Sequence, residues 1–259
     1  MKATGIMVFL VSALLIWTGC NKDQVVNNLV NKVELTDNQR AELVAAQLSA
    51  PTGGVMAELQ TLAAASKPEF YTFAKLDTSV SYHWVNYHLE MAFFLANGTE
   101  IPLYIPGVTD SITGEGVLSG DTTYASPSIP NATWDISLNR HSDMEVGQIL
   151  TDTIRVNGEG ADSSSLVYHG DNLTLTVQSA SQFSVEAVRI PLNDSTFIPI
   201  SGMVNGAVAG TISTDQASKN INIPYTVVFE GNALVTVTLT DSGKTFTVNL
   251  LTGDVTFGG

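Results

Sequence analysis

The sequence predicts a mainly β protein, an antiparallel meander that forms a sandwich or a barrel and is preceded by two short N-terminal helices. Three observations support this fold class. Apolar and polar residues alternate with a period of two over most of the chain after Ser79. Turn-forming pairs rich in Gly, Asn and Asp separate these alternating runs. Two segments with helical spacing precede the first run.

The two expected helices lie between residues 34 and 67. In "LTDNQRAELVAAQLSAP", Thr36 and Gln39 have the spacing of a capping box, and Pro51 ends the helix. The second segment, "VMAELQTLAAAS", begins at Val55 and is ended by a Lys-Pro pair. An apolar stripe on a helix is ordinarily a core contact. We therefore expect both helices to cover the β domain, and we expect no cofactor.

The strands are expected from Ser79 onward, beginning with one long strand that ends at the hairpin pair Asn97-Gly98. The apolar faces of this first strand and of the last third consist of Val85, Tyr87, Leu89, Met91 and Phe93; Ile221, Ile223, Tyr225, Val227 and Phe229; Val235, Val237 and Leu239; and Phe246, Val248 and Leu250. The residues between them are mostly Thr and Asn in the last third, which is typical of an antiparallel sheet with one solvated face. The spacing does not choose between a sandwich and a barrel.

The first nineteen residues have the pattern of a secretory signal. Lys2 is the one charge before the apolar run from Ile6 to Trp17, and the small residues Thr18 and Gly19 close the segment. The run is short for a membrane span, which needs about 20 apolar residues. An ordinary secretory signal and a single N-terminal membrane anchor remain alternatives to the interpretation that follows.

Cys20 is the only cysteine of the 259 residues, so it has no disulfide partner in the chain. Together, Thr18, Gly19 and Cys20 resemble the lipobox of bacterial lipoproteins, in which the cysteine is lipidated and becomes the mature N-terminus. The resemblance implies an acylated Cys20 that anchors the protein to a membrane, since each buried methylene contributes about 0.8 kcal/mol. Asn21 stands where some lipoproteins retained in the inner membrane have aspartate, which favours the outer membrane.

Two stretches near the end of the chain, "ISGMVNGAVAGTIST" and "GKTFTVNLLTGDVTF", resemble the carboxy-terminal strands of a family of exported, β-rich bacterial lipoproteins. This resemblance implies no activity. We expect a signal peptide (1–19), a lipidated tether (20–33), a helical segment (34–67) and an antiparallel β domain (68–259).

The charge balance argues against one class of partner. The chain carries 11 basic and 25 acidic residues, a formal net charge of −14. Nucleic-acid affinity depends largely on neutralising phosphates, so nucleic acid is not an expected partner. The expected partners are the membrane, through Cys20, and a glycan or a small ligand.

The sequence predicts no catalytic residues and no metal site. His141 and Asp143 share a strand face and come nearest to half of a metal site, but solvated polar residues are the commoner interpretation. The chain contains no HExxH and no G-x-S-x-G motif. A glycosidase would need two carboxylates facing a groove, for which the strand residues to inspect are Glu90, Asp135, Glu145 and Glu186.

A candidate binding face lies on the even-numbered side of the first long strand, where Tyr82, Trp84, His88 and Glu90 alternate with inward residues. If exposed, this face would suit a glycan; if covered by a helix, its aromatic residues would be core, which is the commoner state of large aromatic side chains. We expect a non-catalytic envelope lipoprotein with a binding or structural role. The alternatives are a barrel that carries a small ligand and, less favoured, an envelope polysaccharide hydrolase.

Overall fold

A computed structural model describes residues 35–257, apart from 68–76, 83, 126–130, 171–172 and 215–216. The expected signal peptide, the acylation point Cys20 and the tether therefore lie outside the described residues. Within the described part of the chain, no helix is both long enough and apolar enough to cross a membrane.

Helices α2 (Asp37–Leu48) and α3 (Val55–Ala65) confirm the two predicted helices. Thr36 caps α2 through the predicted capping box, accepting a hydrogen bond from the backbone N–H of Gln39 and donating its own backbone N–H to the Gln39 side chain. Gly53 turns the chain between the helices with a left-handed φ of +72°, where a Cβ would also contact Leu138 at 2.8 Å. Ten of the eleven residues of α3 are buried, so this helix is enclosed by the protein on nearly all sides.

The described strands belong to a single twelve-stranded antiparallel sheet. They are β1 (Asp77–Tyr82), β2 (Val85–Leu95), β3 (Glu100–Ile101), β4 (Thr109–Ala125), β5 (Thr133–Gly147), β6 (Thr153–Gly170), β7 (Leu173–Pro191), β8 (Ser201–Ser213), β9 (Ser218–Val228), β10 (Leu234–Leu239), β11 (Thr245–Asn249) and β12 (Val255–Phe257). Eleven of them follow one another in chain order, and the short β3 pairs only with β2. The mainly β meander with N-terminal helices is therefore confirmed.

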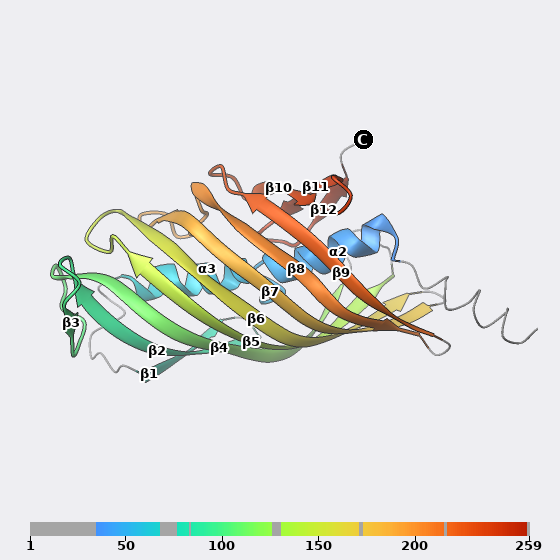
Figure 1. The fold of residues 1–259 in the computed structure, drawn as a ribbon, viewed down its shortest axis with the longest axis horizontal. Helices are drawn as coiled ribbons and strands as arrows, with labels where there is room; N and C mark the ends of the chain where they lie inside the picture. Colours follow the sequence, from blue (N-terminus) through green and yellow to red (C-terminus); the bar gives the residue numbers. More distant parts are fainter. Residues whose placement is uncertain are drawn as a thin grey trace, which may run out of the picture.

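The sheet is open, because β1 and β12 stand at opposite ends of the strand order and do not pair with each other. It is also a single sheet, whereas the sequence left a two-sheet sandwich or a closed barrel as the choices. Figure 1 shows the reason: the sheet curves around α2 and α3, which lie one after the other along its inner face. The helices occupy the space that opposing strands would fill in a sandwich.

The core lies between this inner face and the helices. Buried residues of α2, α3 and the strands from β2 to β11 form one hydrophobic cluster, so the helical segment and the sheet share a core. The predicted inward faces are confirmed, with Tyr225, Val237 and Phe246 among the buried residues. Hydrogen bonds reinforce the packing: Trp134 Nε1 donates to Glu42 Oε2 at 3.0 Å, and Gln60 Nε2 donates to the Thr196 carbonyl at 2.9 Å.

One expectation about the strands was wrong. The sequence suggested one long strand before the hairpin pair Asn97-Gly98, with Tyr82 and Trp84 on its even face, but the chain forms a hairpin in which Tyr82 pairs directly with Val85. Only two residues separate β1 from β2, and neither is a Gly, Asn or Asp that would mark a turn. The alternation of faces is therefore interrupted at Trp84, with consequences for the candidate binding face.

Candidate functional site

The outer face of the sheet, which points away from the helices, carries the main hollows. One is a groove of about 720 Å³ over β2, β4, β5 and β6, and a second of about 530 Å³ lies over β5 to β8. A third, of about 360 Å³, lies over β4, β5 and β6 farther along the strands. Asp143 lines both of the larger hollows, so it stands at their junction.

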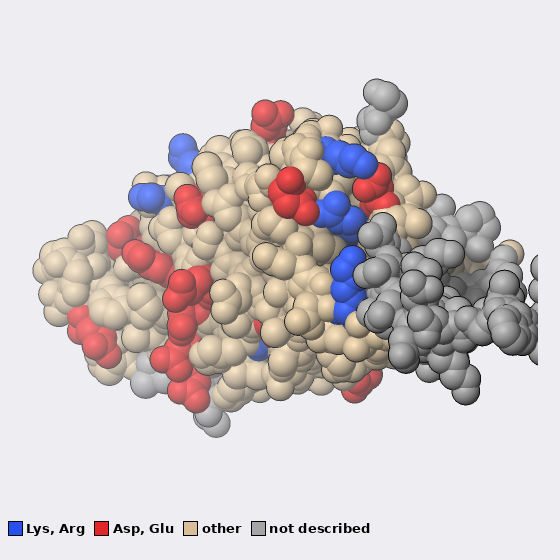
Figure 2. Space-filling model, turned by 45° about the vertical axis from the view of Figure 1, so that its right-hand side comes forward, with Lys and Arg blue, Asp and Glu red and all other residues tan. Residues whose placement is uncertain are grey.

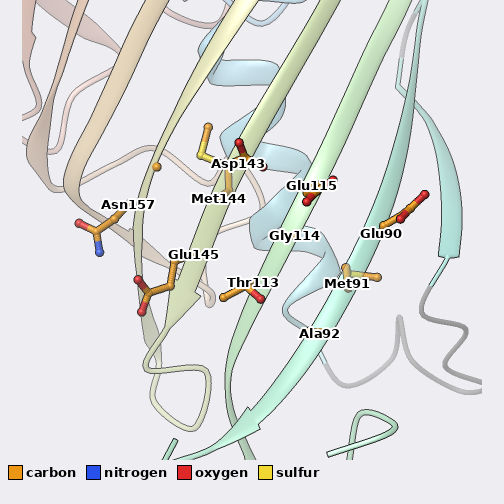
Figure 3. A pocket seen from close by; sticks show the side chains of 11 residues that line it. Glu90, Met91, Ala92, Thr113, Gly114, Glu115, Asp143, Met144, Glu145 and Asn157 are labelled. Atoms are coloured by element: carbon orange, nitrogen blue, oxygen red, sulfur yellow. The ribbon is translucent and has the colours of Figure 1, made fainter. Parts of the chain in front are cut away.

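Carboxylates cross these hollows in a row set by the strand register. Glu90 of β2 pairs directly with Glu115 of β4, Glu115 with Asp143 of β5, and Asp143 with Glu159 of β6. We call these four residues the acidic row. The backbone of Asp77 of β1 pairs with Glu90 and continues the same register. Figure 3 shows Glu90, Glu115 and Asp143 side by side on three neighbouring strands, and Figure 2 shows acidic side chains gathered in a band.

The acidic row is electrostatically unfavourable as it stands. Directly opposed residues on antiparallel strands have Cβ atoms about 4.5–5.5 Å apart, and like charges in such pairs are destabilising. All four side chains are exposed, so water screens part of the repulsion. A surface that keeps four opposed carboxylates is suited to bind cations or hydrogen-bond donors.

His141 adds a nitrogen ligand to this row. It lies two residues before Asp143 on the same face of β5, and its ring lies close to Glu115 and Asp143. One ligating atom from each of the three side chains lies within 4.8 Å of the other two. The sequence paired His141 with Asp143; the structure adds Glu115 from the neighbouring strand.

The predicted binding face is divided between the two sides of the sheet. Trp84 lies in the turn after β1 and packs against the core, with its Nε1 donating to the Pro51 carbonyl at 2.6 Å. His88 and Glu90 lie on the outer face, where His88 Nε2 is 3.9 Å from Glu90 Oε1. The side chain of Tyr82 is outside the described set. Trp84 therefore does not lie on the same face of the sheet as His88 and Glu90, and the three do not form one binding face.

The four carboxylates singled out for a glycosidase are spread over the outer face. Glu90 and Glu145 together line the groove over β2, β4, β5 and β6. Asp135 lies elsewhere: a hydrogen bond from Thr123 and another with His169, 2.9 Å from Asp135 Oδ2, lower the pKa of its carboxyl group. Glu186 accepts a hydrogen bond from Asn205 Nδ2 at 3.0 Å.

A second polar cluster is buried between α3 and the sheet. Arg140, on the inner face of β5, is 1% exposed and lies 3.9 Å from Glu58 of α3 and 3.6 Å from Asp162 of β6. Its guanidinium donates to the Gly53 carbonyl at 3.0 Å and to Gln47 Oε1 at 3.1 Å. This arrangement ties both helices and their turn to the sheet.

The carboxylate of Glu58 also accepts hydrogen bonds from the hydroxyls of Tyr87, at 2.9 Å, and of Ser142. Burial, together with the charge of Glu58, raises the pKa of the Tyr87 hydroxyl well above its usual value. The cluster is enclosed, because the side chains of Glu58 and Asp162 are 0% exposed and that of Arg140 is 1% exposed. We assign it a structural role.

The acidic row was missed by the sequence analysis because its members are far apart in the chain. Glu115 and Asp143 become neighbours only through the pairing of β4 with β5. Strand alternation alone places both on outward faces. The missing information is the register between strands, which depends on where each turn falls.

Comparisons of the chain with protein-family models, with curated proteins and with solved structures gave no match.

Proposed function

We propose that this chain is a non-catalytic binding protein of the bacterial cell envelope, anchored in the outer membrane through an acylated Cys20, and that it binds its partner on the outer face of the sheet. The anchor rests on the Thr18-Gly19-Cys20 pattern after the apolar run. Cys20 precedes the first described residue, Leu35, by fifteen positions. That length is enough to hold the folded part away from the bilayer surface.

The observation that carries the binding surface is the contrast between the two faces of the sheet. Helices α2 and α3 lie along the inner face, while the hollows of about 720, 530 and 360 Å³ lie on the outer face. Ligand sites are ordinarily concave regions with a few converging polar groups. The groove over β2, β4, β5 and β6 meets this description.

The carrier alternative finds less support. A carrier of a small apolar ligand would need an internal cavity, as in a closed eight-stranded barrel. In this chain the sheet is open, and side chains such as Leu59 and Met56 of α3 occupy its inner side.

The hydrolase alternative is also less supported. Glycosidases pair a carboxylate with a protonated carboxylic acid whose pKa is raised, commonly by an apolar pocket. Glu90, Glu115, Asp143 and Glu145 are all solvent-exposed in the groove, so none of them is enclosed in an apolar pocket of this kind.

The chemistry of the groove indicates the class of partner. Carboxylates only accept hydrogen bonds, and the lining adds Thr113 and Asn157. The outer face therefore suits a hydroxyl-rich or amine-bearing envelope glycan and repels anionic polymers.

The anchor is tested with Cys20→Ser in the native host. This substitution keeps the apolar run but removes the thiol that lipid attachment requires. We expect the wild type to incorporate labelled fatty acid and to sediment with outer membranes, and the variant to lose both properties. A variant that is still labelled and membrane-bound would refute the anchor.

The binding surface is tested with two matched triple variants of the full chain in detergent. One carries Glu90→Gln, Glu115→Gln and Asp143→Asn in the acidic row. The control makes the same charge change at exposed sites away from the groove, with Glu100→Gln, Asp152→Asn and Glu230→Gln. We expect binding to polysaccharide isolated from the host envelope to weaken at least tenfold in the first variant only. Equal binding by both variants and the wild type would refute the outer-face site.

A further inference from the structure

Glu115, His141 and Asp143 present three metal-ligating groups to one point on the outer face. Their ligating atoms lie within 4.8 Å of one another. Donors that bind one zinc ion tetrahedrally at about 2.0–2.2 Å are roughly 3.4 Å apart. The three groups therefore need to approach one another by at most about 1.4 Å, a movement that exposed side chains make by small rotations about their χ angles.

The backbone beneath these groups is well suited to hold them. Glu115 and Asp143 are directly paired across β4 and β5, and His141 lies on the same face of β5 as Asp143. Both strands are inside the sheet, with β2 and β6 bonded to their other edges. Sites built on paired strands are positioned more accurately than sites built on loops.

A second His–Asp pair on the outer face, His169 and Asp135, forms a direct hydrogen bond and serves as a comparison. His169 Nε2 lies 2.9 Å from Asp135 Oδ2, and Thr123 completes that group with a hydrogen bond of 2.7 Å. No hydrogen bond or ion pair with another described residue engages the side chains of Glu115, His141 or Asp143. Their donors converge without bonding to one another, which leaves room for an ion between them.

The combination of ligands indicates the class of ion. Calcium and magnesium prefer oxygen ligands alone, whereas an imidazole with carboxylates suits zinc and similar first-row divalent ions. All three side chains face solvent, so water or an oxygen atom of a bound partner can complete the coordination.

We propose that Glu115, His141 and Asp143 form a binding site for a divalent transition-metal ion of the zinc class. An ion bound there offsets the repulsion between the opposed carboxylates, with Glu90 and Glu159 contributing charge from either side. This site goes beyond the proposed envelope function, since it requires neither the lipid anchor nor a glycan.

The test is calorimetric titration of the full chain with ZnCl₂ in detergent, in a Cys20→Ser background that removes the one thiol able to bind zinc. We expect saturable binding of one ion per chain. His141→Gln and Asp143→Asn should each weaken it at least tenfold, while the control His169→Gln should change it less than twofold. Circular dichroism checks that each variant is folded.

Three results would overturn the proposal. The first is no saturable zinc binding by the parent chain. The second is binding that survives both His141→Gln and Asp143→Asn. The third is tighter binding of CaCl₂ or MgCl₂ than of ZnCl₂ in parallel titrations, which would refute the assigned class of ion.

Discussion

Replacing the buried Arg140 with Met should strongly destabilise the protein. Arg140 lies 3.9 Å from Glu58 and 3.6 Å from Asp162, and it is 1% exposed. Met keeps an unbranched apolar side chain, is shorter than Arg and has no charge, so Arg140→Met leaves two buried carboxylates without their cation. It also removes the donors for the Gly53 carbonyl and Gln47 Oε1.

The expected cost follows from the loss of a buried partner. Removing one member of a buried ion pair costs about 3–5 kcal/mol, a large part of a typical stability of about 5–15 kcal/mol. With a urea m-value of about 2–3 kcal/mol/M, the unfolding midpoint should fall by roughly 1–2.5 M. Urea unfolding followed by far-UV circular dichroism and tryptophan fluorescence measures this shift.

A compensating variant separates the charge effect from simple loss of packing. Adding Glu58→Gln and Asp162→Asn to Arg140→Met removes both uncompensated carboxylates while keeping nearly the same side-chain shapes. We expect the triple variant to recover about half of the lost stability, because the hydrogen bonds to Gly53 and Gln47 stay broken. If Arg140→Met costs less than about 1 kcal/mol, or the triple variant is no more stable than the single one, this explanation of the cluster is incorrect.

Three further predictions concern stability. Gly160→Val should lower the free energy of unfolding by about 1–3 kcal/mol, because a Cβ at Gly160 would lie 2.4 Å from Phe183 Cζ. The control is Gly147→Ala, whose added Cβ has no atom within 4 Å, and it should be neutral or slightly stabilising in the same urea assay. The lowered pKa of Asp135 stabilises the fold above the unfolded-state pKa, and this contribution is lost as the pH falls through the folded-state pKa. Asp135→Asn should therefore lower the melting temperature at pH 7 but not at a pH below the folded-state pKa of Asp135. An equal effect at both pH values would contradict the stabilising role of the Asp135 carboxylate. A chain that begins at Ser79 should keep a β-type circular dichroism spectrum but melt at a lower temperature and bind a hydrophobic dye. The reason is that α2 and α3 belong to the same core as the sheet. An unchanged melting temperature would show that the helices do not stabilise the sheet.

Local sequence signals predicted the elements of this fold well. The capping box at Thr36 and Gln39 marks the start of α2, and the alternation of Ile223, Tyr225 and Val227 places their side chains inward. These features depend on neighbours within a few residues. Their physical causes, capping and amphipathic periodicity, are therefore present in any short window of the chain.

The features that the sequence did not predict depend on long-range contacts. The hairpin between β1 and β2 has no Gly or Asn at its turn, so alternation alone suggested a single strand. Whether the sheet closes depends on what packs against its inner face. Short windows of sequence do not contain this information, because α2 and α3 are distant in the chain from most of the strands. The acidic row depends on the register of four strands, each set by turns distant from Glu115 and Asp143.

The burial of Arg140 could be predicted from local sequence, but its ion-pair partners could not. It follows Leu138 on the inward face of β5, so the alternation places it in the core. A charged side chain at such a position is rarely buried without a partner. Its partners are Glu58 on α3 and Asp162 on β6, which lie 82 and 22 residues away in the chain.

The most direct test of the outer-face proposal is native mass spectrometry of the protein extracted with mild detergent from its native host. Because helices lie along the inner face, we expect the mass of a chain that begins at Cys20 and carries covalently attached acyl groups, and no small apolar molecule released on denaturation. A stoichiometric apolar ligand released when the protein unfolds would contradict it, because such a ligand requires an interior site that α2 and α3 would have to vacate.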